Sequence, residues 1–465
     1  MKEQLFQEFP EVSAEQWKNQ VIADLKGADY DKSLIFDSPH GVKVKPFYTS
    51  EDIKGSIQLP PPKPWSICEQ IIAETAGEAN RKAAYALEKG AESIWLVITN
   101  EDITPEALLE GLDLEKVRIF ISMQFLSGDY VENLNSFLAG KKNKVHLQID
   151  IFGNLARTGN YFLGKEEDIT TLNSLFFETS GFKSVVSVDA ALYQNAGATI
   201  PQQLGYALSH LNEYLNILSQ KGQISEGFLP QFILATGGNY FFEIAKIRAL
   251  RWLYATLAKK YNLPGECMIL SQPTKRDKTL YDYNVNLLRT TTQSMSAILG
   301  GANVVYNHPY DVIFHKSNEF GERIARNQLL VMKHEAYLNK AANASDGAYY
   351  IETLTREFAE AGLQIFREVE KEGGFLKLLK QGIIQEKIER SAEKEQQLFD
   401  DGELILIGTN KFTNLQENMG QDLELDPFKK TTLANMEIEP IVEKRLSEKQ
   451  EQERLQKEQS EITQS

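Results

Sequence analysis

Cysteine and histidine are scarce in this sequence, and it has no long apolar run. Only two of the 465 residues are cysteine and six are histidine. Cys68 and Cys267 each lie in an apolar run, which indicates reduced thiols in a core rather than a disulfide or a metal site. No apolar run reaches the roughly 18 residues that a membrane span needs, and residues 1–8 lack the basic and apolar regions of a secretory signal. We therefore expect a cytoplasmic protein with no membrane partner.

Basic residues are fewer than acidic residues in this sequence. The chain has 50 lysine and arginine residues against 65 aspartate and glutamate residues, which gives a formal net charge of −15. A surface with this excess repels polyanions, which argues against nucleic acid and against an anionic membrane as a partner. The sequence also lacks a phosphate-binding loop of the Walker type, because its glycine pairs at 237–238 and 300–301 are typical of turns.

Eight short apolar runs alternate with amphipathic stretches between residues 64 and 309. Strands that alternate with helices predict an α/β fold with parallel strands, and eight of them fit a (β/α)8 TIM barrel over about residues 64–330. A doubly wound sheet shares this alternation. A hydrophobic content of 42% suffices for the core of such a fold. The predicted strands are Trp65–Gln70, Ser93–Ile98, Val117–Gln124, Lys144–Asp150, Ser184–Ala190, Gln231–Thr236, Met268–Gln272 and Asn303–Asn307.

Residues 1–60 are expected to form an N-terminal arm rather than a compact unit. Ser13 and Gln16 make a capping box that predicts a helix, and Ser33–Phe36 with Val42–Lys45 predicts a hairpin. One helix and one hairpin cannot bury their own apolar faces, so the arm must dock on the barrel or on another chain. The apolar side chains concerned are Leu5, Phe6, Phe9, Trp17, Val21, Ile22, Ile35 and Phe36.

The barrel unit is expected to span residues 61–412. It includes helices over about residues 310–400 that cover the flank of the barrel, and a short strand at Glu403–Ile407 outside it. Residues 413–465 form a polar C-terminal tail with almost no apolar residues from about Glu443 onwards. This composition predicts a solvated helix or a partly disordered extension, with the docking of a partner as the alternative.

Eight collinear fragments resemble one family of enzymes. The most specific are Arg-Thr-Thr-Thr at 289–292, Ile-Ala-Arg-Asn at 324–327 and Gly-Ala-Tyr-Tyr-Ile-Glu-Thr-Leu-Thr at 347–355. The others follow the same order at 41–49, 64–67, 194–199, 241–248 and 407–412. Over roughly residues 10–412 they resemble the substrate barrel of adenosylcobalamin-dependent methylmalonyl-CoA mutases. The resemblance implies a TIM barrel and a radical rearrangement that interconverts (R)-methylmalonyl-CoA and succinyl-CoA.

The positions that carry chemistry in catalytic mutases differ in this chain. After the Pro-Trp-Ser-Ile motif, Gln70 stands in place of the tyrosine that shields and positions the radical pair in the family. Before the Gln-x-Ala-Gly-Ala-Thr motif, Ala191 and Leu192 stand in place of a Tyr-His pair. Because leucine cannot donate a hydrogen bond, the contact of that histidine with the thioester carbonyl is lost. Leu270 begins the run that replaces the polar segment with which the family grips the acyl-CoA.

The framework motifs of the family are present in this chain, while three strand ends lack the catalytic side chains of the family. This pattern is similar to that of the small, non-catalytic subunits of heterodimeric members of this family. Gln148 matches an active-site glutamine of the family, but a lone polar residue at a strand end is more often a structural hydrogen-bonding group. We therefore expect no catalytic residue here, and a heterodimer with a catalytic mutase subunit. The resemblance implies that the arm wraps this partner.

A cobalt-ligating histidine is also missing. Cobalamin-binding modules of the family carry Asp-x-His-x-x-Gly, in which the aspartate orients the histidine. None of the six histidines has an aspartate two residues before it, and the chain ends before a module of roughly 100 residues could follow the barrel. We expect this chain to bind no metal and no cofactor, and the partner subunit to hold adenosylcobalamin. The histidines are His40, His146, His210, His308, His315 and His334.

Readings of another class stay open. His308, Asp150, Asp189 and Glu69 could converge at the barrel mouth as the metal site of a hydrolase, although no His-x-His or His-x-x-x-His pair supports it. The chain could also be a self-sufficient barrel enzyme that acts on an acyl-CoA or another small molecule. A subunit of a sister mutase that acts on a different acyl-CoA is a further alternative.

Overall fold

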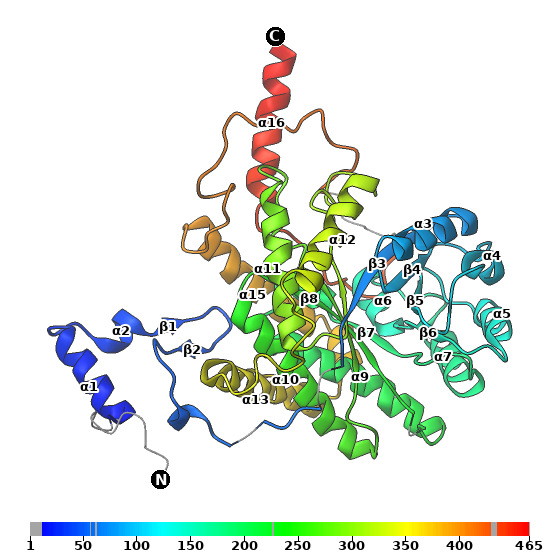
Figure 1. The fold of residues 1–465 in the computed structure, drawn as a ribbon, viewed down its shortest axis with the longest axis horizontal. Helices are drawn as coiled ribbons and strands as arrows, with labels where there is room; N and C mark the ends of the chain where they lie inside the picture. The colour runs from blue at the N-terminus through cyan, green and yellow to red at the C-terminus, as the bar shows by residue number, and fades with distance from the viewer. Residues whose placement is uncertain (1–11, 56, 61–62, 226, 429–434, 465) are drawn as a thin grey trace.

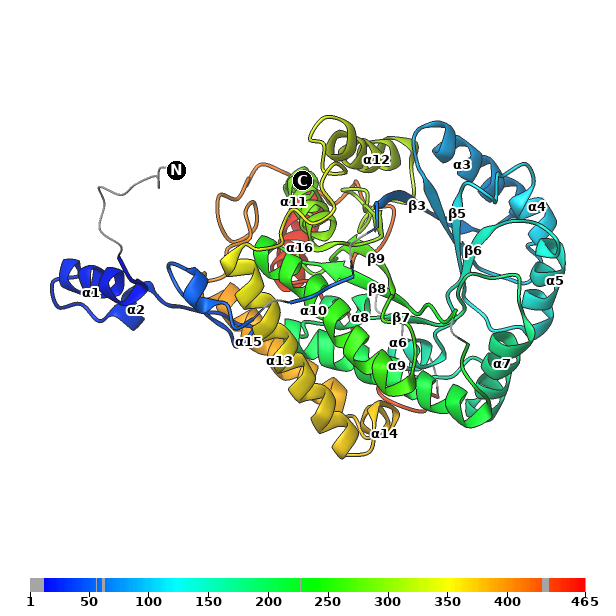
Figure 2. The ribbon, with the colours of Figure 1, turned by 60° about the horizontal axis from the view of Figure 1, so that its bottom comes forward.

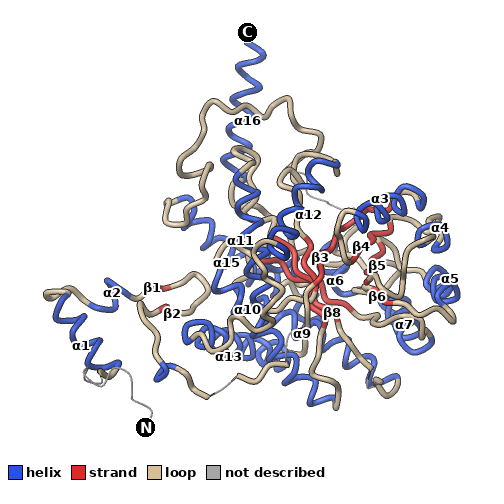
Figure 3. Tube along the Cα trace, viewed as in Figure 1, coloured by secondary structure: helices blue, strands red, loops and turns tan. Residues whose placement is uncertain are grey.

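Eight parallel strands form the centre of the molecule, and helices surround them (Figures 1 and 3). The computed structural model describes residues 12–55, 57–60, 63–225, 227–428 and 435–464. Hydrogen bonds join the strands in the order β6-β5-β4-β3-β10-β9-β8-β7, so every strand lies beside its neighbour in the sequence. The strands are β3 (Ser66–Ala73), β4 (Ser93–Ile98), β5 (Arg118–Met123), β6 (Lys144–Leu147), β7 (Ser187–Asp189), β8 (Gln231–Thr236), β9 (Met268–Pro273) and β10 (Val304–Tyr306).

The sheet closes on itself between β6 and β7. A parallel bridge joins Ile149 to Val186 just beyond the end of β6. The amide of Leu147 donates to the carbonyl of Ser184 at 2.9 Å, and the amide of Ile149 donates to that of Val185 at 3.0 Å. A doubly wound sheet would leave these two edges open. The predicted (β/α)8 barrel is therefore confirmed, and each of the eight predicted runs overlaps one of its strands, although β3 extends to Ala73 and β9 to Pro273.

Helices between successive strands cover the outside of the barrel (Figure 2). The longer ones begin and end at sequence signals: Thr199 and Gln202 form a capping box at the start of α9, and Gly301 ends α11 with a φ of 89°. The helices of the barrel and its flank are α3 (Ala76–Glu88), α4 (Pro105–Leu109), α5 (Gly128–Leu138), α6 (Ile151–Thr158), α7 (Lys165–Glu178), α8 (Ala191–Asn195), α9 (Ile200–Lys221), α10 (Tyr240–Ala258), α11 (Val285–Gly300), α12 (Glu319–His334), α13 (Tyr349–Lys371), α14 (Phe375–Lys380) and α15 (Ile383–Asp400).

The arm extends away from the barrel (Figures 1 and 2). It contains α1 (Ala14–Asp24), which begins at the predicted capping box, α2 (Tyr30–Leu34), and an antiparallel pair of β1 (Phe36–Asp37) with β2 (Lys43–Val44). The hairpin is thus present but shorter than predicted, because Ser33 and Leu34 belong to α2, whose N-cap is Asp29.

The hairpin contacts the barrel while much of the arm remains exposed. His40, in the turn of the hairpin, accepts a hydrogen bond from the amide of Ile200 at 3.1 Å, and Val42 is buried. In contrast, Ile22 is 43% exposed, Phe36 54% and Phe47 51%. The predicted apolar residues Leu5, Phe6 and Phe9 lie outside the described residues.

The segments after α15 differ from their predicted structure in two respects. Residues 403–407 form no strand; a single bridge between Ile407 and Lys411 is the only pairing there, so that prediction was wrong. The end of the chain forms α16 (Glu448–Gln464), which stands out from the barrel in Figure 1. One face of α16 is buried at Glu451 and Leu455, so this helix is not solvated on all sides as predicted.

The chain between α15 and α16 returns to the barrel mouth as a strap, which we define as residues 436–447. Its amides at Ile441 and Lys444 donate to the carbonyls of Ala156 and Asn195, at 2.7 and 3.1 Å. The strap thus contacts α6 and α8, which follow β6 and β7, and the loop after β9, where the amide of Leu446 donates to the carbonyl of Arg276 at 2.9 Å. Across the described part of the chain, no helix combines the length and apolar character that a membrane crossing requires.

Candidate functional site

Large side chains fill the inside of the barrel. Cys68, Trp95, Phe120, Leu270 and Tyr306 belong to one buried cluster that is separate from the main core outside the strands. The rings of Trp95 and Tyr306 meet edge to face with 6.0 Å between their centroids. Side chains that alternate along each strand explain this division, because every second residue points inward. The lumen is therefore a packed core of aromatic and aliphatic groups.

The residues that were predicted to replace catalytic side chains of the family lie in two different environments. Leu270 is buried in the lumen cluster, and Gln70 is aligned with Trp95 in the middle of β3 rather than at its end. Ala191 also belongs to the lumen cluster, whereas Leu192 packs in the main core between strands and helices. Leu192 follows the C-terminal end of β7, but its side chain packs in the main core rather than in the lumen. The short helix α8 begins at Ala191, so two adjacent residues point to opposite sides of the barrel wall.

Gln148 is buried where the barrel closes. Its Nε2 lies 3.4 Å from Oε1 of Gln231, and its own Oε1 has no hydrogen-bond partner among the described residues. Gln231 in turn donates to the carbonyl of Leu147. These contacts link β6 to β8 across the lumen. They are consistent with a structural role for Gln148.

The structure does not gather the four residues of the alternative metal site into one group. Glu69 pairs with Arg326 of α12, Asp189 pairs with Arg157, and His308 lies beside Tyr306 with 5.0 Å between ring centroids. Within the ranges that the structure describes, no three histidine, cysteine, aspartate or glutamate side chains form a group that could hold a metal ion. The contacts of these residues therefore give the alternative no support.

Asp150 belongs instead to a buried network that the sequence did not reveal. One carboxylate oxygen lies 2.9 Å from His210 Nε2 and accepts from the hydroxyl of Tyr214 at 2.7 Å. The other oxygen accepts from the amide of Asp189 at 2.7 Å, and His210 Nδ1 lies 2.9 Å from the hydroxyl of Tyr193. Burial acts to raise the pKa of Asp150, but its contacts with His210 and Tyr214 lower it overall. The network fixes the end of β6 against α9.

His210 and Tyr214 carry no sequence signal of this role, because they lie on a helix whose buried face is mostly apolar. His210 and Tyr214 have no exposed surface, and the side chain of Asp150 is 12% exposed. An aspartate, a histidine and a tyrosine in a row have the composition of a proton relay, but the histidine and the tyrosine are enclosed in the core. We therefore read the network as structural.

A second buried network lies at the ends of β8 and α10. Lys246 forms an ion pair with Glu243 and donates to the carbonyl of Ala235 at 2.7 Å and to Gln203 Oε1 at 3.0 Å. Burial lowers the pKa of Lys246, and the pairing with Glu243 opposes this shift. A lysine with a lowered pKa can act as a base or nucleophile. This ammonium is enclosed by its four partners, one of which is Gln194 at 3.5 Å, so it holds α8, α9 and α10 to the strand.

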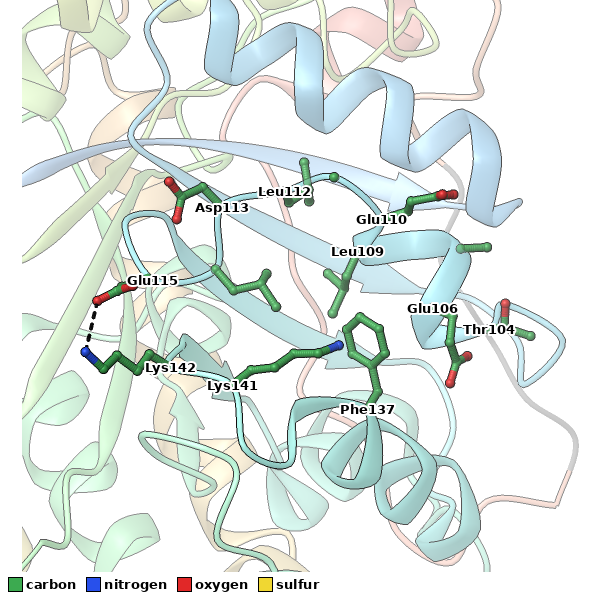
Figure 4. A pocket seen from close by; sticks show the side chains of 13 residues that line it. Thr104, Glu106, Leu109, Glu110, Leu112, Asp113, Glu115, Phe137, Lys141 and Lys142 are labelled. Atoms are coloured by element: carbon green, nitrogen blue, oxygen red, sulfur yellow. Dashed lines mark ion pairs between the residues drawn. The ribbon is translucent and has the colours of Figure 1, made fainter.

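One large cavity lies at the wrong end of the barrel for catalysis. It has a volume of about 780 Å³ and is bordered by α4, α5 and the loops that precede β5 and β6 (Figure 4). Lys141 covers the ring of Phe137 at 3.3 Å, and Lys142 pairs with Glu115 at 3.7 Å. TIM-barrel sites lie at the opposite, C-terminal ends of the strands. We assign this cavity no chemistry.

A cavity of about 570 Å³ lies beside the C-terminal ends of β3 and β10, between α3 and α12. Its floor holds the ion pair of Glu69 with Arg326, and burial raises the pKa of Glu69 despite that cation. Its apolar walls include Ile72 and Leu329. Among the described residues that line it, the His315 imidazole contacts Asp311 and the carbonyl of Asp422, so this histidine is not paired with a nucleophile.

Comparisons with known proteins agree with the motifs. The family model for methylmalonyl-CoA mutase matches residues 97–465. The methylmalonyl-CoA mutase small subunit of Porphyromonas gingivalis is 33% identical over 470 residues, which cover 95% of this chain and 76% of that protein. The methylmalonyl-CoA mutase of Cereibacter sphaeroides is 27% identical over 88% of this chain and 66% of its own length. The human mitochondrial methylmalonyl-CoA mutase is 26% identical, over 92% of this chain and 64% of that protein.

Proposed function

Because this chain belongs to the methylmalonyl-CoA mutase family, we propose that it is a non-catalytic subunit that pairs with a catalytic mutase chain. The pair interconverts (R)-methylmalonyl-CoA and succinyl-CoA by a radical rearrangement that takes place in the catalytic chain. The similarity to a protein named as a small subunit supports this assignment. The chain spans only about two thirds of the human and Cereibacter enzymes, so their activity is not assumed for it.

The filled lumen is the observation that carries the proposal. Trp95, Phe120, Leu270 and Tyr306 occupy the inside of the barrel, and Phe120 stacks on His146 with 5.0 Å between ring centroids. A catalytic barrel needs space for its substrate and polar groups directed at the reacting atoms. Here Leu270 and Ala191 present only hydrocarbon to the lumen. We infer that no substrate is turned over in this chain.

Three of the six histidines, His210, His308 and His315, do not fit the role of cobalt ligand. Burial lowers the pKa of His308 well below its ordinary value, with Lys275 and Lys278 adding to the effect, and its ring lies against Tyr306. His315 is engaged with Asp311, and His210 with Asp150. A cobalt ligand needs an accessible ring nitrogen with an orienting acceptor behind the ring. We place adenosylcobalamin in the partner and derive no step through it here.

The exposed side of the arm supports pairing with a second chain. Ile22, Phe36 and Phe47 leave apolar surface in water on a segment that extends from the barrel. Such surface marks a protein interface more often than a free face. We propose that the catalytic subunit covers these residues. An obligate interface of this kind buries about 2,000 Å² or more in total.

Co-expression with a catalytic mutase chain that carries Asp-x-His-x-x-Gly tests the proposal. Size-exclusion chromatography should show a complex of the two chains, and mutase activity should require the complex or rise in it. The isolated chain should show no mutase activity and no spectral change on titration with adenosylcobalamin. If the chain elutes alone while the partner is fully active without it, the subunit assignment fails. Micromolar cobalamin binding by the isolated chain would overturn the cofactor assignment.

A further inference from the structure

A cavity at the barrel mouth has a positive lining that no role described so far uses. It has a volume of about 340 Å³ and lies between the strap and the loops that follow β9 and β10. These are the seventh and eighth strands of the barrel, whose following loops often bind phosphate in TIM barrels. Arg157, Lys275, Arg276, Lys444 and Arg445 line it, against the carboxylates of Asp426, Glu443 and Glu448. This local excess of two positive charges contrasts with the formal net charge of −15 of the whole chain.

The three carboxylates in the lining are engaged within the protein. Glu443 lies 3.5 Å from Arg157 and accepts from Asn195 Nδ2 at 3.1 Å. Glu448 accepts from the amide of Arg445 at 2.8 Å, and Asp426 accepts from the amide of Phe428 at 2.9 Å. Because each of these groups already serves a hydrogen bond or an ion pair, their charge competes only in part with an incoming anion.

Two of the cations in the lining are not paired with a carboxylate of the described residues. For Lys275 and Lys444, the described residues provide no carboxylate within ion-pair distance of the ammonium group. Both side chains are exposed at the cavity, and their backbones are held in place: each amide donates to Asn195, Lys275 to the side-chain oxygen at 3.0 Å and Lys444 to the carbonyl at 3.1 Å. One asparagine therefore places two free ammonium groups at the same cavity.

Arg445 provides an independent sign of a missing acceptor. Its side chain is 5% exposed, and Nη1 donates to Glu451 at 2.6 Å and to the carbonyl of Lys278 at 3.0 Å. Its Nη2 is buried, and the described residues offer it no hydrogen-bond acceptor. An unsatisfied buried donor costs about 1–3 kcal/mol, more for a charged group. An anionic oxygen in the cavity would supply the acceptor after a small movement of the guanidinium.

We propose that this cavity binds a phosphate group, either free or as the phosphoryl end of a small organic ester. The cations described above recognise the charge, and the apolar walls at Val312, Ile313 and Ile441 accommodate an organic body. Pockets for small molecules have volumes of about 300–1,000 Å³. The volume of this cavity lies near the lower end of that range, which limits the ligand to a small metabolite. The site is independent of the proposed subunit role, since it requires neither mutase chemistry nor a partner chain.

The sequence context agrees with a changed role for this loop. Where catalytic mutases carry the polar run that grips the acyl-CoA, this chain has the run from Leu270 to Asp277, which includes Lys275 and Arg276. Lys278, which follows it, is fully buried and contacts Asp277 and Gln293, whereas Lys275 remains available at the surface. The run therefore places positive charge at the mouth.

Isothermal titration of the purified full-length chain with inorganic phosphate, phenyl phosphate and benzoate tests the proposal. We expect both phosphates to bind and benzoate to bind at least tenfold more weakly, with affinity falling as salt rises. A tighter Kd for phenyl phosphate than for inorganic phosphate identifies an ester as the ligand class, and equal Kd values identify free phosphate.

The variant Lys275→Gln/Lys444→Gln should weaken phosphate binding about tenfold or more and leave the thermal midpoint without ligand unchanged, since neither ammonium group makes an ion pair. Lys449→Gln is the matched control, because this exposed lysine of α16 is close in sequence and lies outside the cavity lining. The proposal fails if no phosphate binds below about 10 mM, or if both variants lose affinity equally. Unchanged binding in the double variant would also overturn it.

Discussion

Replacing Lys246 with methionine is expected to destabilise the barrel strongly. The ammonium group is 1% exposed and forms an ion pair with Glu243, whose side chain is 3% exposed. Methionine matches the length of the lysine stem but leaves the Glu243 carboxylate buried without a cation, and it leaves the Ala235 carbonyl without a donor. Breaking a buried ion pair on one side costs about 3–5 kcal/mol.

This cost converts into a modest shift of the unfolding midpoint. An unfolding entropy of about 2.1 cal/mol/K per residue gives about 1 kcal/mol/K for a chain of 465 residues, so Lys246→Met should lower Tm by about 3–5 °C. The double variant Lys246→Met/Glu243→Gln should recover part of that loss, because it removes the isolated charge. Differential scanning calorimetry of the two variants and of Glu243→Gln alone measures the coupling. A loss below about 1 kcal/mol for Lys246→Met, or purely additive losses, would refute the reasoning.

Three further outcomes are expected. Burial, with Glu213 nearby, raises the pKa of Glu370 from 4.5 to about 7, so between these pH values the folded state holds a proton that the unfolded state has released. Stability should therefore fall as pH rises from about 4.5 to about 7, by roughly 1–2 kcal/mol after allowance for partial exposure, and Glu370→Gln should abolish this contribution in melts between about pH 4.5 and 8. Leu192→His should restore no mutase activity in coupled assays and should lower Tm, because the imidazole enters the apolar main core; a measurable turnover would contradict this expectation. Phe36→Ser should weaken binding to the catalytic chain in surface plasmon resonance without changing Tm. Ile72→Ser is the control: this residue is also exposed but lies on β3, so its replacement should leave binding unchanged. Equal effects of the two variants on binding would show that the arm is not part of the interface.

Much of the architecture was predictable because local patterns sufficed for it. The capping boxes at Ser13 and Thr199 and the left-handed Gly301 act within a few residues, so their helix ends are encoded locally. The eight apolar runs were recognisable because strands covered on both faces are apolar along their whole length. Ile405 and Ile407 made a similar run at 403–407 but form no strand, since no neighbouring strand pairs with them beyond a single bridge.

The direction of individual side chains could not be read from the sequence. Ala191 and Leu192 are adjacent, yet one faces the lumen and the other the main core, because the chain turns into α8 at that point. The polar composition after Glu443 predicted a solvated tail, but Arg445 and Glu451 pair with each other and with the loop after β9, which buries one face of α16. Charged residues look solvated in sequence until a partner distant in the chain satisfies them.

The sequence by itself determined the eight strands that alternate with helices, several helix ends and the membership of the methylmalonyl-CoA mutase family, because periodicity, capping residues and motif order are properties of neighbouring positions. Only the tertiary structure decided whether the sheet closes, which it does through Ile149 and Val186, and which side chains fill the lumen. It also decided where the cations of the strap and of the loop after β9 meet. Closure, packing and charge clusters depend on residues that are far apart in the sequence, and the distances between those residues exist only once the chain has folded.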